Sequence, residues 1–330
     1  MGHKINLNQK INLNELREEL QEKYPHLMIP SQSYLILMSP RSGSTLLCAH
    51  LIKIGFGNPM EGFNVSERSL RENLGTNIDF SNPYEHIKGV LEKGSKNGVF
   101  GLKLSWVQFE LFLKKARELI VLDQKELSDF DILDLFFPDA NLILLKRRDK
   151  VQQAVSFSKA MQTGIWSEKV GSSQEYKDYV RPAEYYHDHI EALFDNLLAF
   201  DLSWEMLLKK NQREYLEIWY EDLAKDYLKT VTEICDYLDV KNDEEITPFL
   251  QKQFDDKSQQ WIERFNHESP WTQDPTIRKG LENGDFNSIF FHRSVLNARK
   301  HERSVWANIP YNKHKTIKRL IFRAKKRLGL

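Results

Sequence analysis

The chain has 330 residues, of which 41% are hydrophobic and 28% are charged, and its 47 basic residues balance 47 acidic ones. This composition excludes a collagen-like, low-complexity or wholly disordered protein, and the zero net charge argues against a wholly basic nucleic-acid binder. Two cysteines, Cys48 and Cys235, are too few for a disulfide framework or a zinc site, so we expect a reducing, cytoplasmic environment. No apolar run approaches the roughly 18 residues of a membrane span, and the N-terminal residues lack the apolar core of a signal peptide.

The predicted elements alternate between strands and helices along the chain. Residues 1–30 form a polar arm with a helix over 15–23. Four apolar runs predict strands at residues 34–38, 98–104, 141–146 and 215–219, and helical spacing follows at 44–52, 154–162 and 227–238. This alternation predicts an α/β fold with three layers, in which helices flank a central parallel sheet. One main domain is expected over residues 31–312, with an irregular segment from about residue 269, followed by a basic tail over 313–330.

The first chemical motif lies between the first predicted strand and its helix. It consists of seven residues, Ser39, Pro40, Arg41, Ser42, Gly43, Ser44 and Thr45. A glycine allows a tight turn, a helix N-terminus supplies free amides, and the arginine and hydroxyl groups add donors. The loop therefore predicts a site for a tetrahedral anion. It is P-loop-like without being a Walker A loop, because no lysine precedes the Ser-Thr pair.

Two further motifs supply cations. Arg147 and Arg148 follow the third predicted strand, and Ser156 lies on the next helix. The carboxyl edge of a parallel sheet is where ligands usually bind, and the planar fork of arginine suits phosphate. The third motif consists of Arg278, Lys279 and Gly280, followed by Gly284-Asp285-Phe286. Each of these motifs alone also fits a solvated basic turn.

Together these motifs resemble the sulfotransferases that use 3′-phosphoadenosine 5′-phosphosulfate (PAPS) as donor. In that family a Pro-(Lys/Arg)-Ser-Gly-(Ser/Thr)-Thr loop holds the phosphosulfate, and an Arg and a Ser hold the 3′-phosphate. An R-K-G-x-x-G-D-W segment is approximated from Arg278 to Phe286, with one extra residue and Phe in place of Trp. The family's Y-E-D-L sequence stands at Tyr220–Leu223, so the resemblance covers roughly residues 34–290.

A subgroup whose type member is the mycobacterial-type trehalose sulfotransferase resembles the chain more closely. Its G-x-P-x-E segment is matched at Gly57–Glu61, and its F-G-x-K strand at Phe100–Lys103. Its R-x-D-K-x-x-Q-A-V-S helix is matched at Arg147–Ser156, and its Q-T-G-x-W sequence at Gln162–Trp166. The resemblance implies sulfuryl transfer from PAPS to a hydroxyl of a carbohydrate or glycolipid, with adenosine 3′,5′-bisphosphate as product, no metal, and a homodimer as one arrangement.

The resemblance also implies roles for single residues. Arg41 would contact the 5′-phosphate and the bridging oxygen, and Tyr220 the adenine. Lys103, from its place on the neighbouring strand, is expected either to reach the sulfuryl group or to be a surface lysine at the strand end. Many family members carry a catalytic His where this chain has Ser105. The subgroup is thought to use the Glu of G-x-P-x-E, which makes Glu61 the expected general base.

Two histidines remain as alternative bases. His187 and His189 form an H-x-H sequence, which can also bind a metal, but no third ligand stands at suitable spacing.

The tail over residues 313–330 carries eight Lys or Arg and no acid, which leaves 39 basic against 47 acidic residues in the first 312. Apolar positions of this tail fall near one helical stripe, so we expect peripheral contact with the inner face of a membrane, or a solvated helix docked on the body. Two other functions stay open: a divergent P-loop kinase, and a non-catalytic nucleotide-binding module that docks on membranes.

Overall fold

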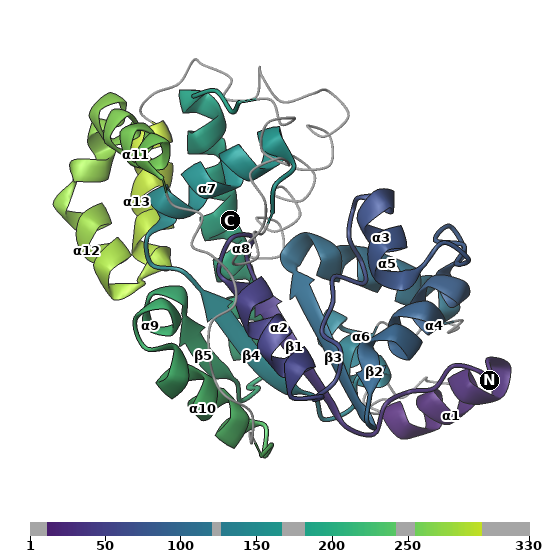
Figure 1. Cartoon of the computed structure of the whole chain (residues 1–330). Coiled ribbons are helices and arrows are strands. Elements are labelled where there is room, and N and C mark those ends of the chain that lie inside the picture. Colours follow the sequence, from purple (N-terminus) through teal and green to yellow (C-terminus); the bar gives the residue numbers. More distant parts are fainter. Residues whose placement is uncertain (1–11, 121–126, 167–181, 242–254, 299–330) are drawn as a thin grey trace, which may run out of the picture. The chain divides into compact units, whose positions relative to one another are not determined.

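The computed structural model describes residues 12–120, 127–166, 182–241 and 255–298 (Figure 1). The chain forms two compact units. The first unit comprises Met1–Leu35 and Leu51–Leu142, and the second unit comprises Ile36–His50 and Ile143–Leu330. Among the described residues, none of the helices is long and apolar enough to cross a membrane. The basic tail at 313–330 lies outside the described residues, and the domain boundaries drawn from the sequence stay a prediction.

A mostly parallel five-stranded sheet runs through the fold in the order β2-β3-β1-β4-β5. Its strands are β1 (Ser33–Met38), β2 (Ser95–Lys96), β3 (Val99–Ser105), β4 (Asn141–Lys146) and β5 (Leu216–Trp219). The pair β4 and β5 is parallel, with Lys146 opposite Trp219, whereas β2 pairs antiparallel with β3. The predicted α/β class is therefore confirmed. The sheet differs from the expected parallel sheet in one short edge strand, β2, which is antiparallel. Nearly every residue of β1, β3 and β4 is buried, as expected for strands covered on both faces.

Helices flank the sheet. Those of the first unit are α1 (Leu13–Lys23), α3 (Glu67–Leu74), α4 (Pro83–Gly94), α5 (Trp106–Leu119) and α6 (Asp129–Phe136). Those of the second unit are α7 (Lys150–Thr163), α8 (His187–Lys210), α9 (Tyr220–Lys225), α10 (Tyr227–Tyr237), α11 (Asp256–Glu268), η2 (Pro270–Gln273), α12 (Pro275–Asn283) and α13 (Phe286–Ala298). Helix α2 (Ser44–Lys53) begins in the second unit and ends in the first. The N-terminal helix α1 packs on α6, because Leu16 and Leu20 are buried and Arg17 donates to the carbonyls of Asp134 and Leu135.

Residues 270–298 are mostly helical, so the expectation of irregular structure was wrong for this part of the segment. Asp274 caps α12 by accepting from the amides of Thr276 and Ile277, and Pro275 occupies the first helical turn. Gly284 ends the helix with a φ of +69°. The proline and glycine that indicated a loop are therefore helix start and stop signals.

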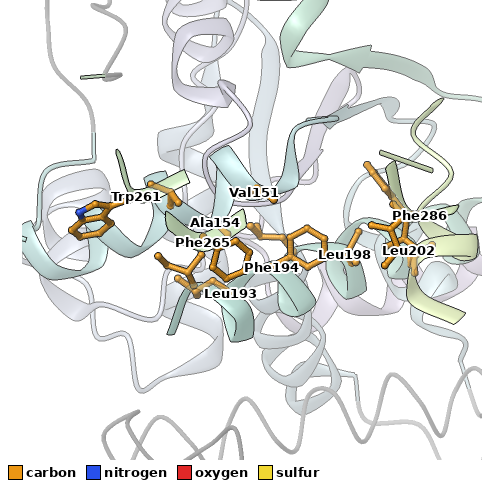
Figure 2. Close-up of a cluster of buried hydrophobic side chains, with 14 of the residues drawn as sticks. Val151, Ala154, Leu193, Phe194, Leu198, Leu202, Trp261, Phe265 and Phe286 are labelled. Carbon is orange, nitrogen blue, oxygen red and sulfur yellow. The ribbon is translucent and has the colours of Figure 1, made fainter. Parts of the chain in front are cut away.

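One apolar cluster builds the core of the second unit. It joins α7 and α8 to α11, α12 and α13 through Val151, Phe194, Phe265, Ile277 and Phe286. Figure 2 labels Val151, Phe194, Phe265 and Phe286 of this cluster. This packing fixes α7, the helix that follows β4 and carries Ser156.

Candidate active site

The loop from Ser39 to Gly43 has an unusual backbone. Arg41 has a φ of +68° and Gly43 a φ of +85°, so two residues of the loop adopt the left-handed region. A Cβ on Gly43 would lie 2.6 Å from Cδ2 of Tyr220, so the ring of Tyr220 closely approaches the loop. Only glycine meets both the conformation and the contact without strain. The loop leads directly into α2, which begins at Ser44 with Leu46 donating to the carbonyl of Gly43 at 3.0 Å.

The guanidinium of Arg41 faces α7. Its Nε donates to Oγ of Ser156 at 3.0 Å, and its Nη1 donates to the backbone oxygen of Trp166. The sequence separates Arg41 from Ser156 by more than a hundred residues, and the structure brings these two predicted donor-binding residues together. Trp166 packs against Phe157 with ring centroids 6.0 Å apart and leaves half of its surface exposed.

Arg147 completes this cluster from the end of β4. Its Nη1 donates to the backbone oxygen of Arg41 at 3.3 Å, and its guanidinium lies 4.4 Å from the ring centroid of Tyr220. Burial, followed by the like charge of Arg147, lowers the pKa of Arg41 to about 10, and burial also lowers the pKa of Arg147. Two neighbouring buried cations disfavour each other's charge, so an anion bound beside them gains from both.

The cluster retains unused donors that fit such an anion. Oγ of Ser42 and Nε of Arg147 are buried and have no hydrogen-bond partner among the described residues. Buried donors are rarely left unpaired, because each costs free energy of desolvation. Ser44 is buried at the start of α2 and Thr45 is exposed on its first turn. Ser42, Gly43, Ser44 and Thr45, which follow Pro40, therefore carry the backbone amides and hydroxyl groups with which proteins bind tetrahedral anions.

Arg148, the neighbour of Arg147, points elsewhere. Its guanidinium pairs with Asp222 at 2.9 Å and lies 4.6 Å from the ring centroid of Trp219. Glu221 accepts hydrogen bonds from the backbone amides of Arg148 and Asp149, each at 3.0 Å. Of the two arginines that the sequence left as alternatives, Arg147 is the one that joins Arg41.

The third predicted motif lies on a helix rather than in a clamp-like loop. Arg278 and Lys279 are exposed on α12. Gly280 is buried, and a Cβ there would lie 2.6 Å from Cγ1 of Ile289, so this glycine allows α12 to pack closely on α13. This packing is a structural reason for Gly280, whereas the two cations remain available at the surface of the second unit.

Glu61 lies in the first unit, where a short pairing fixes it beside Lys103. Met60 forms a parallel bridge with Leu102, and the amide of Lys103 donates to the carbonyl of Met60 at 3.0 Å. The Nζ of Lys103 then lies 2.8 Å from Oε1 of Glu61. This lysine is buried, with 8% of its side chain exposed, whereas Glu61 retains 28%.

Two amide side chains hold the other carboxylate oxygen of Glu61. Nδ2 of Asn64 donates to Oε2 at 2.6 Å, and Nε2 of Gln108 donates to the same atom at 3.0 Å. Gln108 also forms a capping box with Ser105 at the start of α5. Burial raises the pKa of Glu61, but the charge and hydrogen bond of Lys103, then the bonds from Gln108 and Asn64, lower it to below its usual range. Glu61 is therefore ionised at neutral pH and able to accept a proton.

The histidines named as alternative bases already have partners. Nε2 of His187 lies 2.7 Å from Oγ of Ser269, and Nδ1 of His189 lies 3.1 Å from Oγ of Ser158. Burial lowers the pKa of His189. In the described ranges, no cluster of three or more His, Cys, Asp or Glu side chains is arranged to hold a metal ion.

The sequence analysis missed several asparagine and glutamine side chains around Glu61 and around the Arg41 loop. Asn64 and Gln108 hold Glu61, Gln152 accepts from Nη2 of Arg147, and Gln153 contacts the loop. Gln152 and Gln153 do lie within the helix motif from Arg147 to Ser156, but nothing in their residue type signals a role.

The segments that carry the Arg41 cluster and the Glu61 cluster lie in a region that is similar to known proteins. The model of the Stf0 sulphotransferase family matches residues 33–268. The chain is 28% identical over 262 residues to a trehalose 2-sulfotransferase of Mycolicibacterium smegmatis, covering 72% of this chain and 95% of that protein. It is 27% identical over 267 residues to one of Mycobacterium tuberculosis, covering 74% and 97%. Among solved structures, the sulfotransferase domain of the Synechococcus PCC 7002 olefin synthase matches 72% of this chain and 94% of its own, with 20% identity and a TM-score of 0.30.

The family match covers most of the chain and contains the loop, Lys103, Arg147, Ser156 and Glu61, and it ends before α12. The protein belongs to the Stf0 sulphotransferase family.

Proposed function

We propose that the protein transfers the sulfuryl group of PAPS to a hydroxyl of a carbohydrate or glycolipid. The observation that carries this proposal is that Arg41, Arg147 and Ser156 lie together at the loop before α2, in which Arg41 and Gly43 have positive φ angles. Such a site supplies guanidinium forks, hydroxyl groups and backbone amides, which are the donors that phosphate and sulfate oxygens accept.

In the proposed complex, the loop and Arg41 bind the 5′-phosphosulfate, while Arg147 and Ser156 bind the 3′-phosphate. The unused donors of Ser42 and Arg147 support this assignment. Tyr220 packs against the loop and against Arg147, which suits a ring that contacts the adenine. Arg148 is compensated by Asp222 and is left out of this assignment, whereas Arg278 and Lys279 add exposed positive charge from α12.

The reaction forms a bond between the acceptor oxygen and sulfur and breaks the bond between sulfur and the bridging oxygen of the donor. Adenosine 3′,5′-bisphosphate leaves with the electron pair of the broken bond. Glu61 takes the proton of the acceptor hydroxyl, and Lys103 and Arg41 neutralise charge that develops on the sulfuryl and bridging oxygens. Positioning and electrostatics supply most of the rate enhancement in the analogous phosphoryl transfers.

The relatives suggest the acceptor. Both trehalose 2-sulfotransferases align over nearly their whole length with this chain. We therefore propose trehalose, or a lipid or glycan that presents a similar sugar, as the first acceptor class to test.

Two measurements test this proposal. Calorimetric titration should show micromolar or tighter binding of adenosine 3′,5′-bisphosphate, and clearly weaker binding of ATP and of adenosine 5′-phosphosulfate, which lacks the 3′-phosphate. Radiolabelled PAPS should then transfer sulfate to trehalose or to another sugar in an acceptor panel. If ATP binds as tightly as the bisphosphate, and phosphate rather than sulfate reaches the acceptor, the protein is a kinase and the proposal is wrong.

A further inference from the structure

A buried polar chain lies behind the phosphate-binding loop, and the proposed reaction does not use it. Gln153 of α7 donates from Nε2 to Oγ of Ser39 at 2.9 Å and to the carbonyl of Pro40 at 2.8 Å. Its Oε1 accepts from Nζ of Lys150 at 2.8 Å. Lys150 in turn pairs with Oδ2 of Asp201 on α8 at 2.5 Å. The side chains of Lys150 and Asp201 are fully buried, and so is Gln153.

This chain of contacts fixes which way the amide of Gln153 points. A lysine ammonium can only donate, so the oxygen of Gln153 must face Lys150 and its NH₂ group must face the loop. Lys150 is itself held by Asp201 and by the ring of Phe286, whose centroid lies 4.4 Å from Nζ. A buried ion pair contributes little net stability when its desolvation is included, so its value here lies in orientation.

The atoms that Gln153 holds flank the strained residue of the loop. Arg41 adopts a φ of +68°, a conformation that costs a non-glycine residue free energy and persists only where the surroundings impose it. The carbonyl before it, on Pro40, accepts from Gln153, and its own carbonyl accepts from Arg147. Both peptide units around Arg41 are thereby fixed, and with them the direction of the amides that follow.

We propose that Gln153, oriented by the buried Lys150–Asp201 pair, is a positioning residue that holds the phosphate-binding loop in its anion-binding conformation. This inference rests on the proposed donor site. It assigns Gln153 no contact with the donor. Without the two hydrogen bonds the loop would have to be ordered by the nucleotide itself, which would weaken binding.

Two substitutions separate this role from a general loss of stability. Gln153→Glu keeps the volume and the acceptor for Lys150, but it cannot donate to Ser39 and Pro40. Gln153→Met removes the same donors without adding charge. Val155→Ala, in the apolar cluster on the same helix, is the matched control that loses packing only.

We expect both Gln153 variants of the full chain to bind adenosine 3′,5′-bisphosphate roughly tenfold or more weakly, because each loses two buried hydrogen bonds. The KM for PAPS should rise similarly, while the KM for the acceptor stays unchanged. Val155→Ala should lower the melting temperature and leave nucleotide affinity unchanged.

Three results would overturn the inference. The first is that both Gln153 variants bind the bisphosphate as tightly as the wild type. The second is that only Gln153→Glu weakens binding, which would indicate repulsion by its charge. The third is that Val155→Ala weakens binding as much as the Gln153 variants do. If instead the wild type binds the bisphosphate no better than ATP, the proposed function fails first, and the titration shows this before any variant is made.

Discussion

At Glu61, three side chains donate to a single carboxylate, and only one of them carries a charge. Lys103 takes Oε1, while Asn64 and Gln108 share Oε2. This arrangement holds the carboxylate in one orientation and leaves acceptor capacity on Oε1 for a substrate hydroxyl. A general base typically contributes about 10²- to 10⁴-fold to the rate.

Glu61→Gln should therefore lower kcat by about 100-fold or more, since the amide cannot accept the acceptor's proton. The affinity for adenosine 3′,5′-bisphosphate should remain within experimental error, because none of the donor-binding side chains is changed. Steady-state kinetics and calorimetry on the same preparation measure both. A variant that turns over at the wild-type rate would exclude Glu61 as the base and return attention to His187 and His189.

The pH dependence of the reaction provides a second test at this residue. Glu61 has a lowered pKa, so it stays ionised to more acidic pH than an ordinary glutamate. The stabilisation of the fold that its ionised form provides is present above the pKa of the unfolded chain and is lost as pH falls through the lowered folded value.

Lys103→Met should shift the acid limb of the kcat profile to higher pH. The substitution removes the charge and hydrogen bond that lower the pKa of Glu61, and leaves the burial that raises it. Asn64→Leu should shift the limb in the same direction by less, because it removes one neutral hydrogen bond. The midpoint of the limb is the readout, since Lys103→Met is also expected to lower kcat at every pH. An unmoved midpoint in both variants would mean that the limb reports another group.

At the scale of single elements, the loop between β1 and α2 depends on Gly43. Gly43→Ala adds both strain at a φ of +85° and a clash with the ring of Tyr220. Gly98→Ala is a matched control, because Gly98 has a φ of +80° and a Cβ there meets nothing within 4 Å.

Both substitutions should destabilise the protein by about 1–2 kcal/mol through backbone strain. Only Gly43→Ala should weaken binding of adenosine 3′,5′-bisphosphate, by roughly tenfold or more, because the ring of Tyr220 and the guanidinium of Arg147 must move. Thermal unfolding and calorimetry measure the two effects separately. Equal affinities in the two variants would show that the loop does not form the donor site.

The elements also show which parts of the fold could be predicted. The runs at β1, β3 and β4 are mostly apolar and almost wholly buried, and both features are expected of strands covered on both faces. Strand β5 is a shorter, partly exposed run that ends before Tyr220. By contrast, β2 has two residues, both exposed, and carries no such signal. In α12, Pro275 and Gly284 look like breakers, and only their positions at the two ends show that they delimit a helix.

The site shows the same division. The proximity of Arg41, Arg147 and Ser156 could be predicted because charged and hydroxyl groups follow the ends of neighbouring strands, and their role in binding the donor stays a prediction. The roles of Gln153 and Gln108 could not be predicted, because a glutamine in the sequence gives no sign of its partners. Those partners lie on distant segments that only the folded chain brings together.

At the scale of the whole chain, charge is distributed unevenly. The first 312 residues hold 39 basic and 47 acidic side chains, whereas residues 313–330 hold eight basic ones and no acid. We propose that this tail holds a cytoplasmic enzyme at the inner face of an anionic membrane, where lipid-linked acceptors lie. Each basic residue near such a surface contributes about 1 kcal/mol, and the acidic remainder of the chain opposes binding of the body itself.

Deletion of residues 313–330 should abolish binding to vesicles that contain phosphatidylserine and leave kcat on a soluble sugar acceptor unchanged. The full chain should bind these vesicles at low salt, release them as salt is raised, and ignore vesicles of phosphatidylcholine alone, because the attraction is electrostatic and screened. Cosedimentation measures binding, and the sulfate-transfer assay measures kcat on the same samples. Binding that persists after the deletion would place the membrane contact elsewhere. A loss of kcat in solution would show instead that the tail supports the fold or the active site.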